Sequence, residues 1–362
     1  MTLSQWQSEL IAQGAYVEQD TIHHFGNAAQ ELTYLVEDNV MCDLSHLALL
    51  EVSGADAATF LQGQVTNDVK LLNGQQAHYT GYCTPKGRLL GIFLALVHQD
   101  HVHLQMPKAI AEAIAKRLRM FVMRSKVIIT DQSEHIVKIG LNGPGALQIL
   151  SEQFSQLPGE PYATKTHTHA TLLRLPSIAG HQRLPSIAGH QRFEIFTSME
   201  HAKTLWNTFK MKTKLVGKSC WDWLEVQSGI PEVVPATQEQ FVPQMVNLDL
   251  LHAINFKKGC YTGQEIVART HYLGSVKRRT FLMTLSSDSS PQAGDKLADE
   301  HQNEVGQIVR VAPSGIKALS EANTFDVLAE LRIEAQQSGP IYWNSRPLTS
   351  KVMPYSLGLA ES

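Results

Sequence analysis

Apolar residues recur at helical spacing in several stretches of the chain, most clearly after Pro107. Proline is favoured at the first position of a helix, and four apolar residues then fall on one helix face: Ile110, Ile114, Leu118 and Phe121. The same spacing predicts helices at 199–210 and 220–228, and a shorter helix at 54–62 that is capped by Asp56. Each of these helices needs an apolar surface to pack against.

Apolar runs between these helices predict strands. Two strand-like runs within 77–106 surround a turn signal, Pro85-Lys86-Gly87-Arg88, and together they predict a hairpin. Further runs at 127–129 and 136–140 follow the helix that begins at Pro107. Because groups of strands and groups of helices alternate twice, the pattern predicts two α+β halves.

Beyond Lys277 the helical spacing fades. Short apolar runs such as 280–285 and 305–310 alternate with polar turns, which is typical of an all-β domain, and we expect a small barrel. With 362 residues the chain is too long for one compact core. The pattern therefore predicts three units, at 1–130, 131–275 and 276–362.

A nine-residue sequence, Arg-Leu-Pro-Ser-Ile-Ala-Gly-His-Gln, occurs at 174–182 and again at 183–191. A single duplication is not a solenoid, which needs about three or more units. Because the repeat has an odd number of residues, one continuous strand would present the second copy on the opposite face. Proline and glycine in each copy favour a turn, so we expect one copy to form a surface loop.

Composition narrows the class of protein without identifying it. Apolar residues at 43%, charged residues at 18% and a net charge of −3 are ordinary for a soluble chain with no overall attraction to nucleic acid or membrane. The amino terminus lacks the basic start and apolar core of a signal peptide, and no run approaches the roughly 18 apolar residues of a membrane span. We therefore expect a cytoplasmic protein with four free thiols: Cys42, Cys83, Cys220 and Cys260.

Two kinds of weak motif predict no site. Gly217-Lys218-Ser219 matches the end of a phosphate-binding loop, but residue 212 is a lysine where that loop needs a glycine. Three pairs of histidines lack a third ligand at suitable spacing: His23 and His24, His101 and His103, and His167 and His169. We therefore expect neither a phosphate-binding loop nor a metal site.

Cys260 stands in the segment with the most unusual chemistry. Lys257 and Lys258 precede Gly259 and Cys260, and Gly263 follows closely. Glycines on both sides of a cysteine suit a loop that bends tightly and exposes the thiol, and adjacent ammonium groups favour the nucleophilic thiolate. For the other three cysteines the usual role of a small buried residue is favoured. The segment therefore predicts a reactive thiol at Cys260.

The region around Cys260 is also locally basic. Between residues 257 and 279 Glu265 is the single acidic residue, against six cations: Lys257, Lys258, Arg269, Lys277, Arg278 and Arg279. Such a patch suits the carboxylate tail of a ligand, RNA or an acidic partner protein, or is a solvated basic surface. The residues leave these alternatives open.

The run Lys257-Lys258-Gly259-Cys260-Tyr261-Thr262-Gly263-Gln264-Glu265 resembles the signature of the YgfZ family, whose mitochondrial relatives are iron–sulfur cluster assembly factors. The resemblance covers most of 36–280 and includes further pieces at 42–46, 54–63, 66–69, 85–88 and 221–248. The cysteine motif is specific to the family, whereas the N-terminal pieces are shared with the wider aminomethyltransferase superfamily.

The resemblance implies an α+β fold like that of an aminomethyltransferase. Two ferredoxin-like folate-binding modules, 1–130 and 131–275, would precede a C-terminal β-barrel, and tetrahydrofolate or a one-carbon derivative would lie in the central opening. The module 131–275 would carry the cysteine motif. The implied role is assembly or repair of iron–sulfur proteins, including enzymes that thiolate tRNA. The implied partners are folate and iron–sulfur proteins or their assembly machinery, with an indirect part in tRNA modification.

The resemblance also assigns residues. Cys260 is the functional cysteine, with Lys258 and Tyr261 beside it. Glu194 stands where the superfamily has a glutamate that hydrogen-bonds the pterin ring. The remaining folate-binding candidates are Trp221, Asn67, Gln264, Glu265 and Arg269.

Two departures separate the chain from true aminomethyltransferases. Those enzymes carry an Asp pair after the first glycine-containing hairpin, whereas residues 86–93 hold no carboxylate. They also carry an arginine where this chain has Trp221. Loss of a general acid–base group typically costs about 10²–10⁴-fold in rate. We favour a folate-dependent factor with a reactive thiol, and leave open a folate-dependent aminomethyl- or methyltransferase and an RNA- or protein-binding adaptor.

Overall fold

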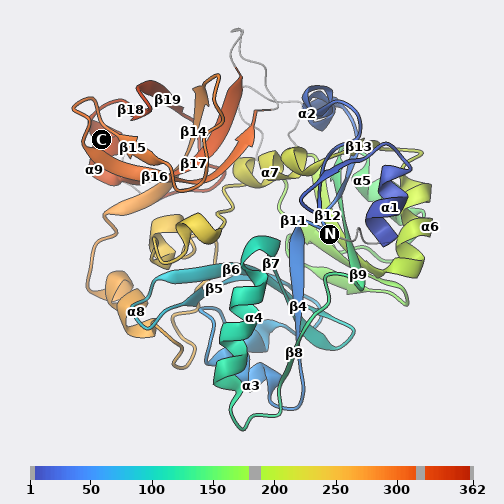
Figure 1. Cartoon of the computed structure of the whole chain (residues 1–362). Coiled ribbons are helices and arrows are strands. Elements are labelled where there is room, and N and C mark those ends of the chain that lie inside the picture. The colour runs from blue at the N-terminus through green and yellow to red at the C-terminus, as the bar shows by residue number, and fades with distance from the viewer. Residues whose placement is uncertain (1–4, 179–188, 315–322, 359–362) are drawn as a thin grey trace.

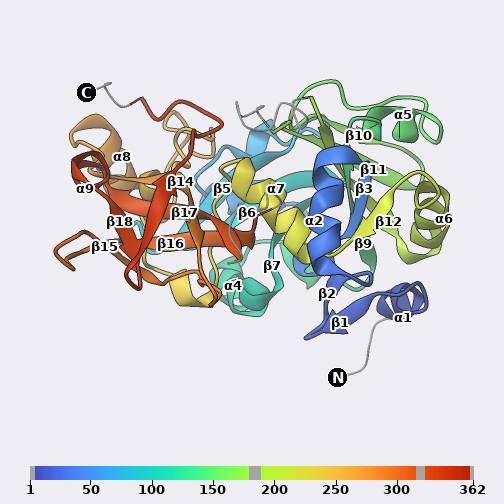
Figure 2. The same ribbon diagram turned by 90° about the horizontal axis from the view of Figure 1, so that it is seen from above.

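The computed structural model describes residues 5–178, 189–314 and 323–358. Within these ranges the strands form a five-stranded sheet, a six-stranded sheet, a closed barrel and a two-stranded hairpin (Figure 1). Seen from above, the barrel and the six-stranded sheet lie at opposite ends, with helix α7 (Lys218–Gln227) between them (Figure 2). The predicted α+β fold with a C-terminal barrel is confirmed.

The five-stranded sheet has the order β5-β6-β7-β4-β8, and all its neighbouring strands are antiparallel. Its strands are β4 (Leu47–Ser53), β5 (His78–Cys83), β6 (Leu89–His98), β7 (His101–Pro107) and β8 (Ile128–Asp131). Three helices share one apolar cluster with this sheet: α3 (Ala57–Gln62), the 3-10 helix η1 (Val69–Leu71) and α4 (Lys108–Val122).

The predicted helix after Pro107 is α4, and the predicted hairpin is β5–β6. Ile110, Ile114 and Leu118 are buried as expected, but Phe121 is 44% exposed because it stands at the last turn of the helix, where the Arg117 guanidinium lies over its ring. Asp56 is the N-cap residue of α3, as predicted, but its side chain makes no capping hydrogen bond. Its carboxylate accepts instead from the backbone N–H of Lys126 at 2.7 Å.

The six-stranded sheet has the order β10-β11-β12-β9-β3-β13. Its strands are β3 (Val40–Asp43), β9 (Ile136–Gly143), β10 (Thr164–Thr166), β11 (Ala170–Leu175), β12 (Gln191–Ser198) and β13 (Lys214–Val216). Strand β3 is antiparallel to β9 and parallel to β13. This sheet therefore combines chain from before and after the five-stranded sheet, so the two sheets do not coincide with the ranges 1–130 and 131–275.

Helices cover both faces of the six-stranded sheet. On one face lie α1 (Gln5–Ile11), α5 (Ala146–Ser151) and α6 (Met199–Phe209), which share an apolar cluster with β3, β9 and β12. On the other face lie α2 (Ala28–Glu37) and α7. The hairpin of β1 (Tyr16–Glu18) and β2 (Thr21–His24) leads into α2. Helices α6 and α7 confirm the two predicted at 199–210 and 220–228.

The barrel closes in the order β14-β17-β16-β15-β18-β19. Its elements are β14 (Arg278–Ser286), β15 (Lys296–Ala298), β16 (Glu304–Pro313), β17 (Thr324–Arg332), the short helix α9 (Ile333–Ser338), β18 (Ile341–Trp343) and β19 (Arg346–Ser350). Buried residues of β14, β16 and β17 join α7 and both sheets in one central core. The barrel is therefore packed into the rest of the molecule.

A connecting segment runs from α7 to β14. It contains the 3-10 helices η3 (Pro235–Thr237) and η4 (Pro243–Val246) and helix α8 (Gln264–Tyr272), which lies beside the β5–β6 hairpin (Figure 1). The loop predicted from the nine-residue repeat falls mainly on residues 179–188, outside the described residues.

Candidate functional site

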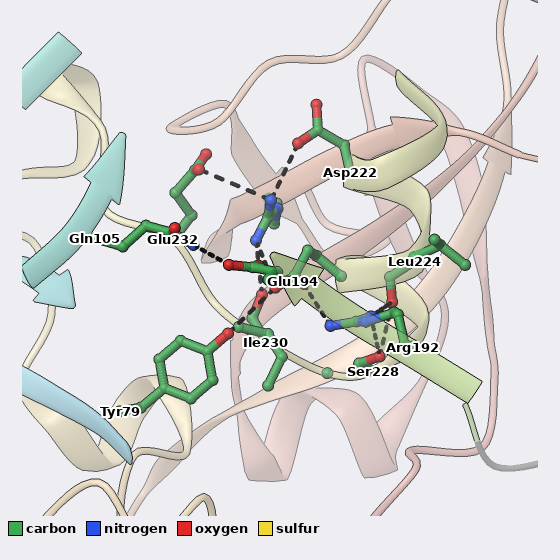
Figure 3. Close-up of polar contacts among 12 residues, drawn as sticks. Tyr79, Gln105, Arg192, Glu194, Asp222, Leu224, Ser228, Ile230 and Glu232 are labelled. Carbon is green, nitrogen blue, oxygen red and sulfur yellow. Dashed lines mark hydrogen bonds and ion pairs between the residues drawn. The ribbon is translucent and has the colours of Figure 1, made fainter. Parts of the chain in front are cut away.

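A small cavity lies where the two sheets, α7 and the barrel meet. Its volume is about 50 Å³, and it is lined by apolar side chains and by seven polar or aromatic ones: Tyr79, Gln105, Glu194, Trp221, Glu225, Glu232 and Arg310. These residues come from β5, β7, β12, α7, the segment after α7, and β16, so every major part of the fold contributes. Figure 3 labels Tyr79, Gln105, Glu194 and Glu232 among them. We call it the inner cavity.

Glu194 is the buried carboxylate of the inner cavity. It is 2% exposed, and among the described residues its carboxylate accepts one side-chain hydrogen bond, from Gln105 Nε2 at 2.9 Å. Burial, with a smaller contribution from the Glu225 carboxylate, raises the pKa of Glu194 to about 7. An acceptor of this kind suits a ligand that brings its own N–H donors.

Trp221 forms an aromatic wall beside Glu194. Gly140 on β9 stands opposite Glu194 in the strand register, and a Cβ at this glycine would lie 2.5 Å from the indole ring of Trp221. The glycine therefore makes room for the indole. The Arg192 guanidinium lies 5.3 Å from the centroid of the same ring, within cation–π distance.

Two buried arginines hold the acidic side chains of α7. Arg192, two residues before Glu194 on β12, pairs with Glu225 and donates to Ser228 Oγ at 2.8 Å. Arg310 on β16 lies 3.0 Å from Asp222, 3.4 Å from Glu225 and 3.8 Å from Glu232 (Figure 3). A buried guanidinium needs such partners, and this network joins the barrel to the cavity wall.

The same charges fix the protonation state of Asp222. Burial alone would favour its neutral form, but the Lys218 ammonium and the Arg310 guanidinium hold the pKa of Asp222 well below its usual value. The carboxylate is therefore ionised at neutral pH.

A larger groove shares part of its wall with the inner cavity. Its volume is about 930 Å³, and the two share Pro107, Glu232 and Arg310 in their walls. Ligand pockets are typically about 300–1,000 Å³, so the inner cavity alone holds only a few atoms, whereas the groove has the volume of a pocket for a ligand of ordinary size. We call this second space the outer groove.

The Cys260 segment lies on a different surface, at the end of the β5–β6 hairpin. Cys260 is exposed and the other three cysteines are buried. Burial raises the pKa of Cys83 to about 12 and the pKa values of Cys42 and Cys220 well above their usual range. The prediction that Cys260 alone presents an accessible thiol is confirmed.

Lys258 anchors this segment. Its ammonium donates to the backbone carbonyls of Val65 at 2.6 Å and Asn67 at 2.8 Å, and it lies 5.1 Å from the ring centroid of Tyr261. Burial lowers the pKa of Lys258 to about 8. Tyr261 is buried, and burial raises its pKa. Because Lys258 and Tyr261 turn inward, Cys260 is left at the surface with the exposed Lys257.

Gly263 allows the segment to lie close against the hairpin. Its φ is +84°, and a Cβ there would lie 2.5 Å from the carbonyl oxygen of Thr84 and 2.9 Å from the Cα of Gly87. Only glycine fits both the backbone conformation and the space. Helix α8 begins at the next residue, Gln264, so the hairpin fixes the start of this helix.

The folate-binding candidates divide between these two places. Glu194 and Trp221 line the inner cavity, whereas Gln264, Glu265 and Arg269 lie on α8, with Glu265 and Arg269 exposed. Asn67 lies between them, and its side-chain amide donates to the carbonyls of Tyr79 at 3.0 Å and His252 at 2.8 Å. Asn67 thus supports the strand that carries Tyr79, and any contact of these residues with folate stays a prediction.

Sequence reasoning missed Tyr79, Gln105, Glu225 and Arg310. One signal was present, because Glu225 stands four residues after Trp221 and so shares its helix face. Tyr79 and Gln105 lie on strands far away in sequence, and nothing near Arg310 distinguishes it from other barrel residues. These residues meet only in the folded chain.

The described part of the chain contains no group of three or more His, Cys, Asp or Glu residues that could hold a metal ion. Among the described helices none is both long and apolar enough to cross a membrane.

Comparisons with known proteins agree with this architecture. Residues 9–258 match the family described as the GCVT N-terminal domain. The tRNA-modifying protein YgfZ of Pectobacterium carotovorum subsp. carotovorum (strain PC1) is 31% identical over 282 residues, which are 78% of this chain and 81% of that protein. The crystal structure of the glycine cleavage system aminomethyltransferase T from Bartonella henselae is similar with a TM-score of 0.76, covering 97% of both chains at 16% identity. At 16% identity, the similarity to the aminomethyltransferase structure concerns the fold alone.

Proposed function

Since the chain belongs to the YgfZ family and carries the GCVT N-terminal domain, we propose that it binds tetrahydrofolate or a one-carbon derivative and supports the assembly or repair of iron–sulfur proteins through Cys260. Its clients in the cytoplasm include tRNA-thiolating enzymes, so its part in tRNA modification is indirect. The inner cavity receives the edge of the pterin ring at Glu194, and Cys260 is the residue that acts on the client.

The observation that carries the folate site is the buried carboxylate of Glu194. A pterin ring presents N–H donors along one edge and a flat face, and the cavity offers a carboxylate acceptor beside an indole and a tyrosine. Gln105 supplies one donor to Glu194, which leaves capacity for further donors. A buried charge of this kind is costly unless a partner completes its hydrogen bonds.

We expect Glu194→Gln to weaken the binding of tetrahydrofolate roughly 10- to 100-fold, because a hydrogen bond to a charged group contributes about 1.5–3 kcal/mol. The unmodified protein should bind in the micromolar range, about 8 kcal/mol. Titration calorimetry measures both proteins, with Glu334→Gln on the exposed surface of α9 as the matched control. Unchanged affinity in Glu194→Gln would place the pterin elsewhere.

The same pKa predicts how binding depends on pH. The affinity should fall as the pH drops through about 7, where Glu194 takes up a proton and can no longer accept as a carboxylate. Because its pKa is raised in the folded state, its contribution to the free energy of unfolding is lost as pH rises from the usual value of 4.5 to about 7. Glu194→Gln should therefore be at least as stable at pH 8, so weaker binding would not reflect unfolding.

We expect no glycine-cleavage-type transfer of an aminomethyl group to tetrahydrofolate. The segment 86–93 holds no carboxylate, and where it reaches the inner cavity it presents the apolar side chain of Ile92. Purified protein with an aminomethyl-lipoyl carrier protein and tetrahydrofolate should form methylene-tetrahydrofolate no faster than the carrier and folate alone. Robust turnover would favour a folate-dependent aminomethyl- or methyltransferase instead.

A further inference from the structure

Four large apolar side chains are exposed where α4 ends and the chain turns into β8, at the lower edge of the molecule in Figure 1. They are Met120 (62% exposed), Phe121, Met123 (88%) and Ile128 (64%). Met123 has the highest exposed fraction of the large apolar residues that the structure describes. Single exposed apolar residues are common on protein surfaces, but a group of them marks a binding surface. We call residues 116–128 the α4 tip.

The α4 tip is also strongly basic. It contains no acidic residue and five cations: Lys116, Arg117, Arg119, Arg124 and Lys126. Arg117 and Arg119 have partners within the protein, because the Arg117 guanidinium lies over the Phe121 ring and Arg119 donates to the backbone carbonyl of Ile129 at 2.9 Å. The side chains of the other three cations are exposed and have no hydrogen-bond or ion-pair partner among the described residues. They are therefore available to an anionic surface.

Asp56, at the start of α3, holds the backbone of the α4 tip in place. The backbone N–H of Lys126 donates to the Asp56 carboxylate at 2.7 Å, and the N–H of Asp56 donates to the carbonyl of Lys126 at 3.3 Å. Gly54 allows this close approach, because its φ is +104° and a Cβ there would lie 2.2 Å from the same carbonyl oxygen. The acidic residues that flank the tip in sequence are Glu112 and Asp131. The tip therefore presents its side chains from a fixed backbone and keeps a surplus of positive charge.

Cations beside exposed apolar side chains fit the surface of an anionic lipid membrane, where the cations meet phosphate groups and the apolar side chains enter the boundary of the acyl chains. RNA offers phosphates but no apolar medium for Met120, Met123 and Ile128. An acidic protein would have to provide a matched apolar pocket, whereas a fluid lipid surface adapts to the tip.

We propose that the α4 tip binds membranes that contain anionic lipids, with Met123 inserted among the headgroups. The protein as a whole has a net charge of −3, so this binding depends on the local surface at the tip. The inference goes beyond the proposed function, because it involves neither the inner cavity nor Cys260.

Co-sedimentation of the full chain with lipid vesicles tests the proposal. Vesicles of equimolar phosphatidylcholine and phosphatidylglycerol should bind the protein at least about tenfold more tightly than vesicles of phosphatidylcholine alone, because each cation near an anionic lipid surface contributes a factor of about five. Added salt should release the protein from the anionic vesicles, because it screens the charges at the tip.

Two substitutions separate the charged and the apolar contributions. Arg124→Glu should weaken binding to the anionic vesicles at least about tenfold, because it reverses the charge of a cation at the tip. Met123→Ser should weaken it about tenfold, because burying a methionine side chain in an apolar medium contributes about this factor or more. The matched controls are Lys257→Glu, an exposed cation beside Cys260, and Met211→Ser, a methionine that is 78% exposed just after α6. Both controls should bind like the unmodified protein, and thermal unfolding checks that every variant is folded.

Binding to the anionic vesicles that both tip substitutions weaken and both controls keep supports the assignment. The inference is wrong if the two kinds of vesicle bind equally or not at all, or if Arg124→Glu and Met123→Ser bind like the controls. If the unmodified protein leaves the vesicles unbound but retards labelled tRNA in a gel, and Arg124→Glu does not, the tip is a surface for RNA instead. The proposed function stands or fails separately, on folate binding and on Cys260.

Discussion

Replacing Cys260 with alanine should abolish the support of iron–sulfur enzymes in cells that depend on this protein, while folding and folate affinity stay nearly unchanged. Cys260 is exposed, and exposed substitutions away from special features usually change stability by no more than about 0.5 kcal/mol. The inner cavity contains no atom of Cys260 in its wall. Complementation of a deletion strain measures function, and thermal unfolding with folate calorimetry measures the rest.

The chemical side of this prediction is the order in which the four cysteines react. With iodoacetamide near neutral pH, Cys260 should be labelled first, because burial shields the other thiols and raises their pKa values. Lys257→Met and Lys258→Met, compared by peptide mass spectrometry, test whether either ammonium supports the reaction. If Cys260 is labelled last, or if its alanine variant rescues iron–sulfur enzymes fully, the cysteine has a structural role.

Arg310→Met should destabilise the protein by about 3–5 kcal/mol, the effect of removing one partner from a buried ion pair. The change leaves Asp222, Glu225 and Glu232 without the guanidinium that they face. It also removes a polar link between the barrel and α7. Urea unfolding measures the loss, and Arg346→Met, which breaks an exposed pair with Asp288, should change stability by less than about 1 kcal/mol.

The acid dependence of stability should report the same network. Since Asp222 has a lowered pKa in the folded state, it adds to the free energy of unfolding above its usual pKa of 3.8, and this contribution disappears as the pH falls further. In Arg310→Met this part of the acid sensitivity should be smaller. Equal unfolding midpoints for Arg310→Met and Arg346→Met would show that the buried network contributes nothing.

The sequence predicted those parts of the fold that depend on local pattern. The helices α4, α6 and α7 and the hairpin β5–β6 follow from spacing and turn residues, and the fading of helical spacing after Lys277 predicted the barrel. The exposure of Phe121 could not be predicted, because an apolar stripe on a helix does not show how far along the helix the sheet that it packs against extends. Nor could the place of β3, because strand pairing over a long separation is decided by tertiary packing.

The candidate site was predicted only in part, for a related reason. Glu194, Trp221 and Cys260 stand in segments that resemble a known family, and the exposure of Cys260 also follows from the glycines and lysines around it. Lys258 was expected beside the thiol, yet its ammonium is held by two backbone carbonyls of a distant loop. Tyr79 and Arg310 come from other strands and carry no local signal, so they could be assigned to the cavity only from the structure.

The position of β3 also constrains the order in which the protein can be made. Synthesis proceeds from the amino terminus, and domains generally fold as they emerge. The five-stranded sheet is complete once residue 131 has left the ribosome, but β3, made earlier, must wait for β9 at 136–143 and for β13 at 214–216. Until β9 has emerged, β3 is an unpaired strand with apolar residues on both faces, and until β13 has emerged it is the edge of its sheet. Open strand edges of this kind are prone to aggregation. The nascent chain therefore needs a chaperone most before residue 216 has left the ribosome.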